Sequence, residues 1–392
     1  MQIRSGINTM IDTVELSIPV LPAELLGGPV VGMPVWNYRR RGPGYEVLTL
    51  GTRSMEKREG VYYPVIEGIL RSNKGVQEAS VKIKFSVPKL MYGNNVDELT
   101  GKEFKAVINV LQIRLRALGL GITTDSLANA IVRTLHYGKN VELKNGHTAR
   151  HAISELRKVN LTKRLTLKEK VFANDGEGLY FGSKPHSLVF YDKAADLRRG
   201  RGKALDASQE WRDTELARSI EGRNVLRMEV RLNNKRKINA VFNHLGLGSN
   251  PTFKDVFSRA KSRKVLRDYW DTYIAGDSVA LFANMPSPQE ILKQVLIVLP
   301  AMRSKAKEAV YRTGLILLAR DIGGMRGLRS LLGAHCDSRA WYGLVKDIRG
   351  VAARIAKLNP RGWYGQIEKA LDNYQPFQLD SKRSGRGKIK TI

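Results

Sequence analysis

Apolar and polar residues alternate with a period of two in several short segments of the first 245 residues. The clearest segment is Val225–Leu232, in which apolar and charged residues alternate. This pattern predicts a strand with one face on a hydrophobic core and one polar face. Strict alternation near the start of the chain places Asp12 on the same face as Val14 and Leu16. Similar patterns predict strands at residues 11–18, 45–50, 61–70, 81–86, 131–137 and 187–193.

Helical periodicity is clearest at residues 100–118, where Thr100 and Glu103 have the spacing of a capping box and Gly119 follows the last turn. Two more helices are predicted before residue 245, at 147–159 and 208–220. Beyond residue 252 every pattern is helical: 253–275, 288–299, 304–320, 324–332, 339–358 and 362–373. The predicted fold class is therefore α+β, with a largely antiparallel N-terminal sheet and packed helices, followed by a C-terminal all-helical domain.

The same patterns suggest how the chain is divided. A Gly- and Ser-containing segment separates the mixed part from the helical part, and the last residues are basic with no periodicity. We expect a disordered leader at 1–9, an α+β domain at 10–245, a linker at 246–252, a helical domain at 253–376 and a basic flexible tail at 377–392.

Composition points to a polyanionic partner. The chain has 66 Lys and Arg residues against 37 Asp and Glu residues, a formal charge of +29, and the basic residues recur throughout. Nucleic acid is the leading partner for such a field, although a ribosome or an anionic membrane would also attract it. The single cysteine, Cys336, excludes an internal disulfide framework and fits a cytoplasmic location. Apolar runs are too short for a membrane span.

Common catalytic motifs are absent from the sequence, which has no phosphate-binding glycine loop, no paired cysteines and no His-Glu-x-x-His motif. Their absence argues against a nucleotide cofactor and against a metalloprotease. His147 and His151 have helical metal-ligand spacing, but only Glu155 lies nearby, so a solvated helix face is favoured. Residues 315–332 have the pattern of two helices around a glycine turn, which is found both in helix-turn-helix motifs and in ordinary helical hairpins.

Tyr191 is the candidate nucleophile. The period of two puts it on the same side of segment 187–193 as Lys193, and a nearby ammonium stabilises a phenolate. The alternative is a tyrosine with only a packing role on a half-buried strand.

Glu229 lies between Arg227 and Arg231 on the polar face of its strand. It could belong to a ladder of salt bridges, or it could bind a divalent ion while the two arginines grip a phosphodiester. The residues alone leave both interpretations open. His136, on another predicted strand, is either structural or a ligand.

Taken together, four stretches resemble the filamentous-phage gene II/X family of replication initiators, which start rolling-circle replication in phages and plasmids. The resemblance extends from about residue 10 to residue 245. It rests on the order and spacing of Met10–Val14, Val81–Asn95, Leu188–Leu197 and Leu226–Leu232.

The resemblance implies that residues 10–245 form a DNA-nicking domain. In this family a tyrosine attacks a phosphodiester, keeps the 5′ phosphate and frees a 3′ hydroxyl, and the enzyme rejoins the strand after replication. The matching residues are Tyr191 as nucleophile with Lys193 beside it, and Glu229 as ligand of Mg²⁺ or Mn²⁺. His136 replaces the family's usual carboxylate as a second ligand. The expected DNA-binding residues are Arg227, Arg231, Lys82, Lys84, Lys89 and Arg133.

The expected partners are single-stranded and origin duplex DNA, together with a host helicase and polymerase, and no membrane. If Tyr191 is not the nucleophile, Tyr137 and Tyr180 are the next candidates. The alternative function is a non-catalytic basic DNA-binding protein, a repressor or a packaging protein. An RNA-binding protein is a third class, but no aromatic-rich RNA-binding stretch supports it.

Overall fold

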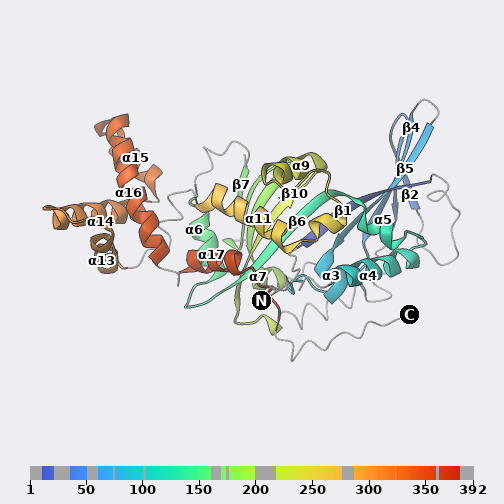
Figure 1. Cartoon of the computed structure of the whole chain (residues 1–392), viewed down its shortest axis with the longest axis horizontal. Helices are drawn as coiled ribbons and strands as arrows, with labels where there is room; N and C mark the ends of the chain where they lie inside the picture. Colours follow the sequence, from blue (N-terminus) through green and yellow to red (C-terminus); the bar gives the residue numbers. More distant parts are fainter. Residues whose placement is uncertain are drawn as a thin grey trace, which may run out of the picture.

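The computed structural model of the chain is shown in Figure 1. It describes residues 11–21, 36–50, 61–73, 76–99, 103–159, 169–173, 176–198, 218–275, 287–322, 324–358 and 362–379.

Ten strands within these ranges form one sheet in the order β2-β3-β4-β5-β1-β6-β10-β9-β8-β7. Every neighbouring pair is antiparallel. The strands are β1 (Ile11–Val20), β2 (Trp36–Gly42), β3 (Tyr45–Leu50), β4 (Val65–Asn73), β5 (Val76–Ser86), β6 (Ile131–Leu143), β7 (Glu169–Ala173), β8 (Gly178–Ser183), β9 (His186–Asp192) and β10 (Asn224–Leu232). The antiparallel sheet predicted from alternation is therefore confirmed, whereas β2, β7 and β8 carry no alternation that predicts them.

The described helices fall into three groups: most of those near the sheet pack on one face of it, α7 packs with Val225 on the other face, and a third group lies apart from the sheet (Figure 1). They are α3 (Val87–Tyr92), α4 (Phe104–Ala117), α5 (Thr124–Ala128), α6 (Ala149–Leu156), α7 (Lys193–Arg198), α9 (Lys235–His244), α10 (Phe253–Val256), α11 (Arg259–Tyr269), α13 (Pro288–Val298), α14 (Lys305–Asp321), α15 (Met325–Leu332), α16 (Ser338–Leu358) and α17 (Trp363–Asn373). A π-helical turn, Trp270–Ala275, continues α11, and a 3-10 turn, Gly333–His335, follows α15.

Helix starts follow local capping chemistry only in part. The expected capping box at Thr100 lies outside the described residues, and α4 begins after Glu103 without a side-chain cap. A capping box is present instead at α10, where Thr252 and Asp255 each bond the backbone of the other. Most of the helix expected at 208–220 also lies outside the described residues.

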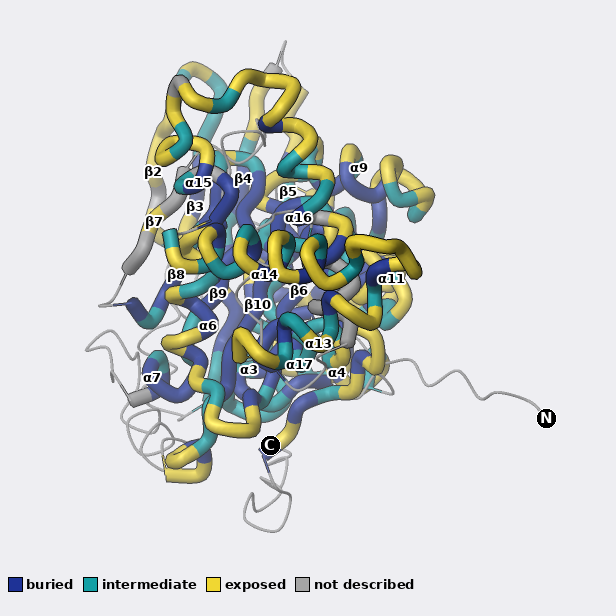
Figure 2. Tube along the Cα trace, turned by 90° about the vertical axis from the view of Figure 1, so that its left-hand side faces the viewer, coloured by how far each residue is buried: buried dark blue, intermediate teal, exposed yellow. Residues whose placement is uncertain are grey.

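The main hydrophobic core lies between the sheet and the helices. The strands at its centre are buried on both faces, whereas the outer helices carry the exposed residues (Figure 2). On β10 the side chains of Leu226, Met228, Val230 and Leu232 are fully buried in this core. Burying each such side chain contributes about 1.5–3 kcal/mol, so the alternation that predicts β10 also fixes which face turns inward.

Hydrophobic clusters divide the chain differently from the expected limits. Phe253, Trp270, Trp363 and Tyr374, which the expected limits place in the helical domain, lie in the same hydrophobic cluster as the sheet. A second core joins α13–α16 and includes none of these residues. The helices α10, α11 and α17, on the C-terminal side of residues 246–252, thus share the core of the sheet, and the expected domain limits stay a prediction.

Among the described helices, none is long and apolar enough to cross a membrane.

Candidate metal centre and nucleophile

The polar faces of four neighbouring strands (β1, β6, β10 and β9) meet opposite the main helical layer. Directly paired residues on adjacent antiparallel strands lie on the same face. Across β10, Arg231 pairs with His136 and Arg227 pairs with Asn140 of β6. On the other side of β10, Arg227 pairs with Tyr191 of β9. The register thus brings the candidate nucleophile, the candidate ligands and the flanking arginines to one face.

Asp12 joins this face through a β-bulge. Ile11 pairs with Tyr137 and Thr13 pairs with His136, so Asp12 is an extra residue on β1. The buried neighbours are Ile11 and Val14, and both residues between them are partly exposed. The expectation that Asp12 shares the face of Val14 is therefore wrong, because the bulge interrupts the alternation. The sequence signal of this bulge lies in residues 11–14, where an apolar residue is followed by two polar residues and another apolar residue.

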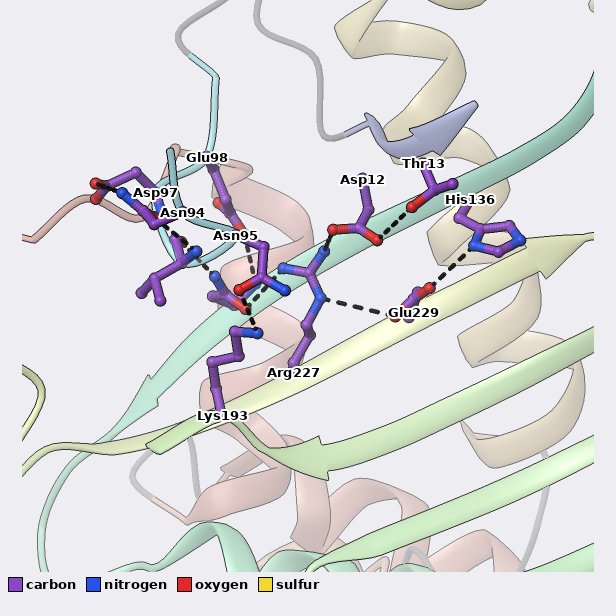
Figure 3. A network of polar contacts seen from close by, with 12 residues as sticks. Asp12, Thr13, Asn94, Asn95, Asp97, Glu98, His136, Lys193, Arg227 and Glu229 are labelled. Carbon is purple, nitrogen blue, oxygen red and sulfur yellow. Dashed lines mark hydrogen bonds and ion pairs between the residues drawn. The ribbon is translucent and has the colours of Figure 1, made fainter. Parts of the chain in front are cut away.

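Asp12, His136 and Glu229 form the one group of three candidate metal-ligating side chains found in the described part of the chain (Figure 3). One ligand atom from each lies within 4.8 Å of the others, and His136 Nδ1 is 3.3 Å from Glu229 Oε1. Ligand atoms that share an ion at about 2.0–2.6 Å can be separated by at most about 5 Å. His136 Nε2 is also buried without a hydrogen-bond partner among the described residues. The group fits a divalent cation.

The surroundings of Glu229 favour the ionised form of its carboxyl group. It is 2% exposed, and burial alone would raise the pKa of its carboxyl group. The hydrogen bond from His136 and the charges of Arg231 and Arg227 outweigh burial and lower that pKa below its ordinary range. Arg231 donates through Nε to Glu229 Oε1 at 2.9 Å and through Nη2 to Oε2 at 3.3 Å. Glu229 is therefore ionised at neutral pH.

Tyr191 lies on β9 and keeps part of its surface exposed. Burial of the phenol raises the pKa of Tyr191 well above its ordinary value. The charge of Arg227 lowers this pKa in part, whereas Glu229 and Asp12 raise it further. These charges act on the phenol because it faces the same cluster, and they leave it neutral at pH 7.

Lys193 does not lie on the strand as expected, because β9 ends at Asp192 and Lys193 begins α7. Its side chain nevertheless returns to the predicted neighbour. Lys193 Nζ lies 5.4 Å from the centre of the Tyr191 ring and donates to Asn95 Oδ1 at 2.9 Å and Asp196 Oδ2 at 3.3 Å. The side chain is fully buried; burial lowers the pKa of Lys193, and Asp196 opposes that shift.

The basic residues expected to bind DNA have different surroundings. Lys82 and Lys84 lie on the site face of β5, but Lys82 is 3.8 Å from Glu67 and Lys84 pairs with Glu15 of β1. The charge of Lys82 is therefore partly balanced, and Lys84 lies opposite an acidic residue in the strand register. Arg231 is 36% exposed at its side chain.

Of the three other expected DNA-binding residues, Arg227 is buried, whereas Arg133 and Lys89 are partly exposed. Arg227 is 2% exposed. Arg133 is the extra residue of a second bulge, where β1 pairs with β6. Lys89 belongs to the short helix α3. Their contact with DNA stays a prediction.

The other candidates of the sequence fall elsewhere. Tyr137 is fully buried on the core face and donates to the carbonyl of Val256 at 2.8 Å, so it is not available as a nucleophile. Tyr180 pairs with Val189 of β9 and therefore lies on the site face. The rings of His147 and His151 stack 6.4 Å apart without joining any group of three ligands in the described residues.

The protein is thus an antiparallel-sheet protein whose polar face carries two carboxylates, an imidazole and a tyrosine, a set that includes a candidate metal centre. A family model described as the N-terminal part of a phage replication-associated protein, the gene II protein, matches residues 47–247, more than half of the chain. The chain belongs to this family, which confirms the resemblance to gene II-type replication initiators. No curated protein and no solved structure matches the chain. The matched residues include His136, Tyr191 and Glu229, whereas Asp12 lies before them.

Proposed function

We propose that this protein nicks one DNA strand at a replication origin through a covalent 5′-phosphotyrosine at Tyr191 and rejoins the strand after replication. The observation that carries the proposal is the register that sets Tyr191 beside Arg227, one strand away from Glu229 and two strands away from His136. The family's role in replication supports DNA as the substrate.

The proposed reaction is a transesterification. The phenol oxygen of Tyr191 forms a bond to the scissile phosphorus and loses its proton, while the bond from phosphorus to the 3′ oxygen breaks and that oxygen takes up a proton. The reverse attack by a 3′ hydroxyl restores the phosphodiester and the free tyrosine. No bond energy is lost to hydrolysis, so rejoining requires no nucleotide cofactor.

The charges of the site agree with this chemistry. Arg227 and Arg231 balance the carboxylates of Asp12 and Glu229, so the four groups together are neutral. A Mg²⁺ or Mn²⁺ ion held by Asp12, His136 and Glu229 would supply the positive charge that offsets the phosphodiester oxygens. Its two charges match one phosphodiester and one phenolate. Lys193 lies close enough to the ring to stabilise negative charge on the phenolate.

The proposed partners follow from the reaction. The substrate is single-stranded DNA at the nick site within an origin duplex, and the freed 3′ hydroxyl is a primer for a polymerase. A host helicase and a host polymerase are therefore the expected protein partners, in the cytoplasm.

A covalent adduct tests the proposal. The full-length protein is incubated with Mn²⁺ and a single-stranded oligonucleotide from its own origin, and the products are separated on a denaturing gel. The wild-type protein is expected to form an adduct that retains the 5′ phosphate side. Tyr191→Phe is expected to form none, and the matched variant Tyr180→Phe is expected to keep the reaction. An adduct formed by Tyr191→Phe would overturn the assignment. Tight duplex binding with no adduct from wild type would favour a repressor or packaging protein.

A further inference from the structure

Arg227 is more closely involved with the candidate metal centre than a DNA-binding arginine would be. Its guanidinium donates through Nη2 to Asp12 Oδ1 at 2.6 Å and through Nη1 to Asn140 Oδ1 at 3.1 Å (Figure 3). Its Nε lies 3.8 Å from Glu229 Oε2, an ion pair without a hydrogen bond. Two of these three contacts are carboxylates of the candidate metal centre. With 2% of its surface exposed, Arg227 presents almost nothing to a passing DNA strand.

Gly138 provides the space for this guanidinium. It pairs with Glu229 across β6 and β10. A Cβ atom at Gly138 would lie 2.5 Å from Arg227 Nη2 and 2.8 Å from Arg227 Cζ, distances at which one of the groups must move. No left-handed backbone conformation requires a glycine here, since Gly138 is not among the residues with positive φ. The close approach of Arg227 to the strand is therefore the reason for this glycine.

The position of the Arg227 guanidinium offsets the repulsion between the carboxylates of Asp12 and Glu229. Asp12 and Glu229 come from different strands, and Asp12 projects from a bulge, where the ladder of hydrogen bonds holds it less firmly. Like charges close together in a buried site repel each other. A planar guanidinium can hold two carboxylates at a fixed separation, which a flexible ammonium cannot do as well.

We propose that Arg227 is the positioning residue of the metal centre and that it fixes the carboxylates of Asp12 and Glu229 at the separation a divalent cation needs. Gly138 leaves the space that the Arg227 guanidinium occupies. The inference rests on the proposed metal site but not on the identity of the nucleophile.

Metal binding without DNA tests the inference. Mn²⁺ is titrated into the full-length protein and followed by calorimetry and by the electron paramagnetic resonance signal of the free ion. Groups that orient metal ligands typically account for about 10–100-fold in affinity. We expect Arg227→Met and Gly138→Ala each to lower the Mn²⁺ affinity by this factor. Gly138→Ala retains every charged group of the site. The matched control is Gly121→Ala, because a Cβ there would meet no atom within 4 Å.

Arg227→Lys separates positioning from simple electrostatics. It keeps the positive charge but not the planar fork, so positioning predicts at least a tenfold loss of Mn²⁺ affinity. Unchanged affinity in this variant would overturn the inference. Tighter Mn²⁺ binding by Arg227→Met would also overturn it, because the arginine would then be a competing cation.

Thermal melting in the presence of a chelator shows whether each variant is folded. If Arg227→Met or Gly138→Ala unfolds, Arg227→Lys, which conserves charge and nearly conserves volume, decides the question. The adduct assay reports separately on Tyr191. Loss of the adduct in Tyr191→Phe with no effect of Arg227 on Mn²⁺ affinity would reject the positioning role alone.

Discussion

Tyr191 lies in surroundings that keep its phenol neutral at pH 7, so the proposed attack requires that the phenol lose its proton. Burial raises the pKa of Tyr191 well above its ordinary value, and the positive charge of Arg227 opposes this only in part. Well below its pKa, the ionised fraction of an acid rises about tenfold for each pH unit. Glu229, with its lowered pKa, is already ionised across the neutral range and adds no change there.

The rate of adduct formation should therefore rise with pH. Under single-turnover conditions with saturating Mn²⁺ and oligonucleotide, we expect the rate to increase steadily from pH 6 to pH 9. Rapid quenching and denaturing gels measure it. A rate that stays flat or falls over this range would mean that the phenol is not the group that limits attack.

At the same scale, the sequence predicts some residues of the site and misses others. Glu229 stands out in the sequence as a carboxylate between two arginines, and His136 is matched through the family resemblance; both belong to the candidate cluster of the structure. Asp12 is missed as a ligand because the neighbouring strand determines the bulge that turns it. The structural role of Gly138 depends on a contact with Arg227, which no local pattern contains.

At the scale of elements, hydrogen bonds hold the short segment after α17 beside the candidate metal centre. Glu98 is 4% exposed and accepts hydrogen bonds from Lys139 Nζ at 2.8 Å and from the backbone N–H of Phe377 at 2.7 Å. The backbone N–H of Asn140 also donates to Glu98. Asn140 in turn holds Arg227, so Glu98 connects the chain beyond α17 to the candidate metal centre.

Removal of one partner from this buried pair should be costly. Breaking a buried ion pair typically costs about 3–5 kcal/mol because the remaining charge stays uncompensated. We expect Glu98→Ala to lower the free energy of unfolding by about this amount in urea titrations. The double variant Glu98→Ala with Lys139→Met should be less destabilised than Glu98→Ala alone. Additive losses in the double variant would show that Lys139 and Glu98 are not coupled.

Element types are easier to predict here than their packing. Alternation identifies β10 because its inward face is a continuous apolar row, whereas Lys139 interrupts the inward row of β6. The position of α17 cannot be deduced in the same way, since its amphipathic pattern would suit any apolar surface. Only the structure shows that Trp363 and Tyr364 of α17 pack in the core of the sheet.

At the scale of the whole molecule, the two larger of the three hydrophobic clusters in the described residues predict which part of the chain can be removed. The second core joins α13–α16 alone. The helices on either side of it meet, because the rings of Trp270 and Tyr364 lie 5.1 Å apart. A short connection can therefore replace everything between them.

We expect a chain in which about twelve Gly and Ser residues replace residues 276–361 to fold and to keep its Mn²⁺ affinity. A chain ended after residue 252 should not fold stably, because it lacks the helices that cover the sheet. Circular dichroism, thermal melting and Mn²⁺ titration compare the two. Cooperative melting of the chain that ends after residue 252 would contradict the assignment of α10, α11 and α17 to the core of the sheet. It would support the linker expected at 246–252.

The central claim is that Tyr191 attacks DNA beside a metal centre made by Asp12, His136 and Glu229. Its most direct measurement is peptide mapping by mass spectrometry of protein incubated with Mn²⁺ and its own origin oligonucleotide. The account predicts a nucleotide attached through a phosphate to Tyr191, and none in the Asp12→Asn protein. A nucleotide on another residue, or an unchanged yield in the Asp12→Asn protein, would contradict it.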